Sequence, residues 1–166
     1  MPQGSSAASA TIRDQILETW RINNRINLLL IDRIDDEGWT STTSTRGGRD
    51  VARQFAHLHN VRIGWLEVCA KDLLKGLPKL ESKVSPTKAA AARALEASGR
   101  AIETLIARGL DADGAMRGFK RGTIPALGYL IAHDSHHRGN ILLTLKLTGH
   151  KVDTETQYGI WDWNKL

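Results

Sequence analysis

Apolar residues recur at intervals of three and four positions along most of the chain, which is the spacing of amphipathic helices. The first such stretch covers about residues 11–36, where Thr11 is placed to cap the start and Gly38 to mark the end. Ser, Thr and Gly then dominate a loop over residues 40–48. The apolar positions of this first predicted helix are Ile12, Ile16, Ile22, Ile26, Leu29, Leu30 and Ile34.

A second helix is predicted over about residues 49–75, and Gly76 and Pro78 are expected to stop it. Ser85-Pro86 is a start signal for a third helix, because a capping hydroxyl precedes a proline whose missing N–H costs nothing in the first turn. This third helix should reach Arg108 and stop at Gly109. The stripe of the second helix runs through Val51, Phe55, Leu58, Arg62, Leu66, Cys69 and Leu73.

The fourth predicted helix begins at Thr123-Ile124-Pro125, continues to Thr148 and stops at Gly149. Its apolar residues cover most of the circumference, which is typical of a helix that is central in a bundle or buried at a subunit interface. The aromatic segment 158–163 is expected to pack back onto the bundle. Four long helices and almost no strand signal predict an all-α, four-helix-bundle fold.

Composition is consistent with one soluble domain over residues 11–166, preceded by a disordered tail over residues 1–10. The chain has 166 residues, of which 41% are hydrophobic and 25% charged. No apolar run reaches the ~18 residues of a membrane span, and the first ten residues do not resemble a signal peptide. Cys69 is the single cysteine, so no internal disulfide can form and a cytoplasmic location is expected.

The formal charge of +5 is concentrated in the middle of the chain, where residues 41–121 carry a net +7. Such a region could attract an anionic substrate or nucleic acid. The charges are scattered, however, and no basic run is interleaved with aromatic residues. A solvated helical surface is therefore the better interpretation, and we expect no nucleic-acid partner.

Three histidines lie close together in the fourth predicted helix. His133 and His137 are four residues apart and so share a helix face, but His136 lies three residues from His133 and is not excluded by spacing. His57 and His59 of the second helix point about 200° apart, so only one of them can complete the group. Three histidines around one ion leave a coordination position open, as in catalytic sites. An exposed polar stripe is the alternative, but the apolar neighbours of the cluster argue against it.

Two segments resemble the DinB/YfiT-like superfamily. In its first signature the metal-binding histidine is followed eight and nine residues later by a bulky aromatic residue and Leu, as His57 is by Trp65 and Leu66. The second signature is similar to His133-x-x-x-His137-Arg138-Gly139. The chain departs from the pattern at Asn140, where the family usually has Gln, and this shorter amide puts any contact inferred for that position in doubt.

The resemblance implies that His57, His133 and His137 are the metal ligands and that His59 and His136 are not. It also implies a homodimer, a Zn or Ni ion, and a small-molecule substrate. Relatives include metal-dependent transferases and isomerases that use low-molecular-weight thiols such as mycothiol, bacillithiol or glutathione. A thiol-dependent S-transferase is thus the first functional hypothesis, and a metal-dependent hydrolase or a non-catalytic metal- or ligand-binding protein is the alternative.

Several neighbours of the histidines allow two interpretations. Asp134 could be a general base, as Glu is in H-E-x-x-H peptidases, or the ion-pair partner of Arg138 one turn later. Arg138 could instead hold an anionic substrate, and Asn60 could contact a ligand or only solvent. Glu155 is a distant candidate for a third ligand, and Cys69 is expected to be a core residue. Mid-helix Gly64 and Gly139 indicate either close helix packing or substrate access.

Overall fold

The computed structural model describes residues 10–166, and within this range the chain forms helices and no strand. The predicted tail, apart from Ala10, lies outside the described residues. Helix α1, Ile12–Arg33, begins as expected at Thr11, whose side chain and that of Asp14 form a reciprocal capping box. The predicted end at Asp36 is wrong, because Asp35 caps a separate short helix, α2, Asp36–Trp39. Gly38 lies within α2 rather than stopping α1.

Helix α3, Val51–Cys69, is capped by Asp50 and ends at Cys69, after which the 3₁₀ helix η1, Lys71–Leu74, covers the rest of the predicted second helix. Helix α4, Lys88–Asp111, is capped by Thr87 and continues through Gly109. The prediction that Gly109 stops this helix is therefore wrong. A Cβ atom there would lie 2.1 Å from Oγ1 of Thr123, so this glycine allows close packing instead.

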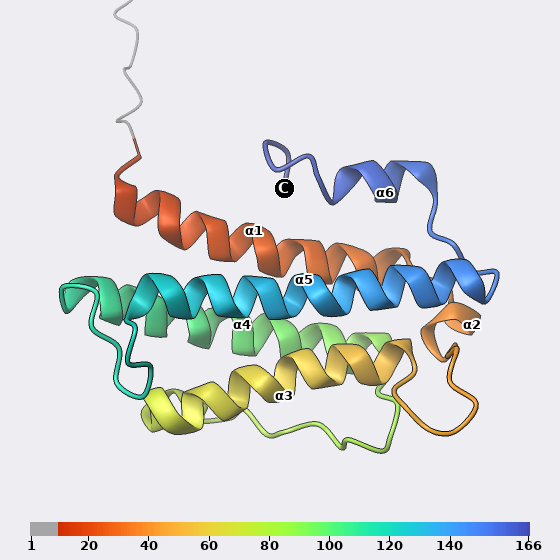
Figure 1. The fold of residues 1–166 in the computed structure, drawn as a ribbon, viewed down its shortest axis with the longest axis horizontal. Helices are drawn as coiled ribbons and strands as arrows, with labels where there is room; N and C mark the ends of the chain where they lie inside the picture. Colours follow the sequence, from red (N-terminus) through yellow and green to blue (C-terminus); the bar gives the residue numbers. More distant parts are fainter. Residues whose placement is uncertain (1–9) are drawn as a thin grey trace, which may run out of the picture.

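Helix α5, Thr123–Leu147, agrees with the fourth predicted helix, and a short helix α6, Thr154–Gly159, follows it. The four long helices α1, α3, α4 and α5 lie side by side along the long axis of the molecule (Figure 1). Helix α4 packs against both α1 and α3, and α5 packs mainly against α3. The all-α bundle predicted from the sequence is confirmed, and none of the helices within residues 10–166 is long and apolar enough to cross a bilayer.

The C-terminal segment returns along α1 (Figure 1), as expected, but only part of it is buried. Ile160 joins the core, whereas Tyr158 and Trp161 are 74% and 76% exposed. Helix α5 is also less enclosed than its composition suggests, because Leu143 and Leu147 face outward.

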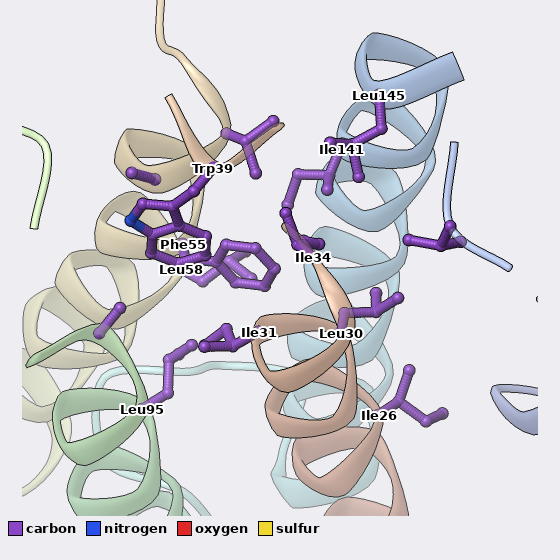
Figure 2. Packing of buried hydrophobic residues seen from close by; sticks show 14 of the residues in the cluster. Ile26, Leu30, Ile31, Ile34, Trp39, Phe55, Leu58, Leu95, Ile141 and Leu145 are labelled. Atoms are coloured by element: carbon purple, nitrogen blue, oxygen red, sulfur yellow. The ribbon is translucent and has the colours of Figure 1, made fainter. Parts of the chain in front are cut away.

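Two apolar clusters form the core. In the cluster shown in Figure 2, the rings of Trp39 and Phe55 stack at 5.3 Å and face aliphatic side chains such as Ile34 and Ile141. The second cluster contains Trp20, Leu66 and Ile102, among others. Each of the four long helices contributes one or two buried polar residues between these clusters, and we call this set the polar layer. Its members are Asn23, Asn27, Arg62, Ser98, Asp134 and Arg138.

Candidate metal centre

Helices α3 and α5 bring three histidines together at the level of the polar layer. His57 comes from α3, and His133 and His137 from α5; one ring nitrogen of each lies within 4.8 Å of those of the other two. The ring centroids are 5.2 Å apart for His57 and His133, and 4.7 Å apart for both other pairs. This is the grouping that the resemblance implied.

The two competing histidines lie elsewhere. His59 is buried and places its ring nitrogens 3.0 Å from the carbonyl oxygen of Ala94 and 2.9 Å from that of Pro78. His136 is exposed, and its Nε2 lies 3.1 Å from the side-chain amide of Asn140. Neither residue therefore belongs to the group of three, and the assignment of His57, His133 and His137 as metal ligands stays a prediction.

The three histidines are suited to a divalent ion. Burial, followed by the positive charge of Arg49, lowers the pKa of His57 to about 4. Burial and the neighbouring imidazoles likewise lower the pKa of His137 to about 4. Both rings are neutral at pH 7, which is the form that binds metals. The Nδ1 atoms of His133 and His137 are buried and have no hydrogen-bond partner within residues 10–166. Neutral imidazoles with nitrogens left unsatisfied are the donor set of zinc and related ions.

A buried network lies directly behind His133. Oδ2 of Asp134 accepts hydrogen bonds from Arg62 at 2.7 Å, Asn23 at 2.8 Å and Asn27 at 2.9 Å. Burial alone would raise the pKa of this carboxyl group, but the charge of Arg62 and these hydrogen bonds outweigh it and hold the pKa well below its usual range. A carboxylate so strongly stabilised in its charged form is a poor general base, so that reading of Asp134 is not supported.

The predicted ion pair between Asp134 and Arg138 is wrong. Arg138 donates to the side-chain oxygens of Asn23 at 2.8 Å and Asn27 at 3.0 Å, and to Ser135 at 2.8 Å. The two asparagines thus connect Arg138 to the carboxylate, and this largely buried guanidinium is committed to the network rather than to an anionic substrate.

Sequence reasoning missed the role of Arg62, which had been counted among the positions of an apolar stripe. Its side chain is 1% exposed, and its guanidinium lies 4.8 Å from the Trp20 ring centroid in addition to pairing with Asp134. An arginine at a core-facing position of a helix is itself the available signal, because a buried charge requires a partner.

The remaining candidates lie outside the histidine group. The side-chain amide of Asn60 donates to the carbonyl oxygen of Leu80, and its Oδ1 accepts from the Leu80 backbone N–H. Asn60 therefore holds this loop in place and is not directed at a ligand. Glu155 is exposed in the first turn of α6 and is not part of the group. Cys69 packs beside the second core cluster, and burial raises the pKa of its thiol, as expected for a core residue.

An open polar pocket of about 390 Å³ is lined by His137 of the group and by the exposed His136. On the other side of the site the Tyr129 ring stacks over His133 at 6.3 Å and contacts Trp65 and Phe119. A Cβ atom at Gly64 or Gly139 would meet nothing within 4 Å, so close helix packing does not explain these glycines. The pocket is lined by Thr42, Thr43, Ser44, Arg49, Gln54, His136, His137, Asn140, Leu143, Thr144 and Leu147.

Fold and site together define a helical bundle with a three-histidine centre. The model of the DinB family matches residues 4–161, and the chain belongs to this family. A search of curated proteins and a search of solved structures each returned no match.

Proposed function

We propose that this protein is a metal-dependent enzyme, a thiol-dependent S-transferase, in which His57, His133 and His137 hold one zinc or nickel ion. The observation that carries the proposal is the convergence of three imidazoles, of which that of His137 also lines an open pocket. A divalent ion held there would act as a Lewis acid and stabilise the thiolate of a low-molecular-weight thiol, the nucleophilic form.

The surrounding residues favour thiol transfer over hydrolysis. No carboxylate lines the described pocket, and Asp134 is occupied by Arg62 and two asparagines. A free thiol loses its proton with a pKa of about 8.5, against about 15.7 for free water, so a thiol needs less help from a protein base before it binds the metal.

Other side chains of the protein would bind the cosubstrate, exclude water and position the imidazoles. The polar pocket would receive the cosubstrate next to His137, and the rings of Trp65, Phe119 and Tyr129 would keep water from the opposite side of the site. The buried network behind His133 would hold the α5 imidazoles in place.

The test is a conjugation assay with protein reconstituted with Zn or Ni, using glutathione, bacillithiol or mycothiol and the electrophile monochlorobimane. We expect conjugate formation above the spontaneous rate only when metal and a thiol are both present. The rate should fall to background in His137→Ala and persist in His150→Ala, because His150 lies outside both the histidine group and the pocket lining. Conversion of an ester or amide substrate without a thiol would replace the transferase by a hydrolase, and metal binding without turnover would indicate a binding protein. The expected homodimer stays a prediction, for which light scattering is the direct measurement.

A further inference from the structure

Among the residues that the structure describes, the only fully charged side chain that lines the pocket next to His137 is positive. Arg49 is the one Lys or Arg residue in its lining, and no Asp or Glu is present there. The rest of the polar lining consists of hydroxyl, amide and imidazole groups, contributed by the 42–44 loop, Gln54 of α3 and one face of α5. Such a lining offers many hydrogen-bond donors and one full positive charge, which is the composition of an anion site.

Arg49 is free to receive that anion. It is exposed and takes part in none of the ion pairs formed among residues 10–166. The adjacent carboxylate of Asp50 is used elsewhere, because it accepts hydrogen bonds from the Arg53 backbone and from the Ser85 hydroxyl. Without a competing carboxylate, the guanidinium keeps its capacity for a bidentate contact.

The position of Arg49 relative to the histidines is set by the backbone. The Val51 backbone N–H donates to the Ser41 carbonyl oxygen, which closes the intervening loop onto the start of α3. Arg49 and His137 line the same pocket, and the positive charge of Arg49 contributes to the lowered pKa of both His57 and His137. An anionic group held by Arg49 would therefore lie within a small molecule's length of the metal centre.

We infer that this pocket is a subsite for a carboxylate of the thiol cosubstrate, with the Arg49 guanidinium as counter-ion and the hydroxyls of the 42–44 loop and Asn140 as further donors. The inference rests on the proposed function for the thiol, but the carboxylate subsite itself depends only on the pocket. One guanidinium matches a singly charged carboxylate, whereas the phosphate sites of proteins use several cations or a free helix N-terminus. The start of α3 is already capped by Asp50.

The experiment compares 3-mercaptopropionate with 3-mercapto-1-propanol, which differ in charge but not in chain length. Dissociation constants are measured by NMR titration of the ¹⁵N-labelled, Zn-loaded protein. We expect the anionic thiol to bind about tenfold more tightly, as one charge-assisted contact allows. Arg49→Gln should bring the two constants together and Arg49→Lys should restore part of the difference. The matched control is Arg46→Gln, in the same exposed loop but outside the pocket lining, and it should keep the full preference.

A third ligand, propionate, separates this inference from the proposed function. In metal-free and Zn-loaded protein, propionate should shift the backbone amide signals of residues 42–44 and 49, and Arg49→Gln should abolish these shifts. If propionate does so while neither thiol binds in a metal-dependent way, the subsite stands and the thiol transferase fails. The subsite is wrong if Arg49→Gln leaves the ratio of the two thiol constants unchanged, or if neither thiol binds and propionate shifts no signal in the loop.

Discussion

The Arg62 guanidinium and the Asp134 carboxylate lie 2.7 Å apart in the middle of the bundle, where each side chain is 1% exposed. The pair links α3 to α5 directly behind the three-histidine centre. A buried ion pair contributes little net stability when intact, but removing one partner leaves the other charge without compensation.

Asp134→Ala should therefore lower the free energy of unfolding by about 3–5 kcal/mol, measured by urea denaturation. The matched control is Asp162→Ala, which removes the ion-pair partner of the exposed Lys165 and should change stability by less than about 1 kcal/mol. Similar losses in the two variants would contradict the importance assigned to the buried pair.

Metal content should distinguish the histidines. His57→Ala, His133→Ala and His137→Ala should each lower bound Zn at least about tenfold, because two imidazoles leave the ion under-coordinated. His136→Ala should retain it, since that ring is exposed and outside the group. Elemental analysis after exhaustive dialysis is the measurement, and equal metal in all four variants would overturn the ligand assignment.

His59→Ala should lower stability without lowering metal content, unlike the variants of the three proposed ligands. The buried His59 ring contacts the Ala94 and Pro78 carbonyl oxygens, so its loss should cost about 1–3 kcal/mol of stability. Bound metal per folded molecule should remain unchanged. A drop in metal content at unchanged stability would show that His59 reaches the ion after all.

The metal-free protein should lose stability as the pH falls from about 6.5 towards 4. The pKa values of His57 and His137 are lowered to about 4, whereas the same residues titrate near 6.5 in an unfolded chain. The unfolded chain thus binds more protons in this window, so the free energy of unfolding decreases with falling pH. Urea midpoints at pH 7 and pH 5 measure the slope, which should become shallower in the double variant His57→Gln/His137→Gln. An unchanged slope in the double variant would refute the assignment.

Gly109→Ala should destabilise the bundle by about 1–3 kcal/mol, because the new methyl group would lie 2.1 Å from Oγ1 of Thr123. Gly128→Ala is the control in α5, where nothing lies within 4 Å of a Cβ atom and the better helix propensity of alanine should stabilise slightly. Thermal unfolding of the two variants gives the comparison. Equal midpoints would indicate that α4 and α5 move apart easily at this point.

The helices could be predicted from periodicity because each long helix buries one apolar face. Gly38 and Gly109 were misread because glycine marks close contacts between elements as well as helix ends, and only the neighbouring element distinguishes the two. Likewise, spacing narrowed the histidines to two alternatives on each helix. The orientation of α3 relative to α5 places His57, and not His59, next to His133 and His137.

Arg62 and Asn60 show a second limit of the sequence. Their partners, Asp134 and Leu80, are 72 and 20 positions away, so no local pattern could assign them. Periodicity identifies which residues face inward. It does not identify which buried donor meets which acceptor.

The polar layer also has a consequence for how the helices are aligned along the bundle axis. Apolar side chains can slide past one another at modest cost, but a displacement of α5 by one turn would push Asp134 away from Arg62 and into hydrocarbon. The polar layer therefore fixes the positions of α1, α3 and α5 relative to one another along the bundle axis. Because His133 and His137 lie next to Asp134 and Arg138 on α5, the same contacts fix the axial position of these two histidines relative to His57.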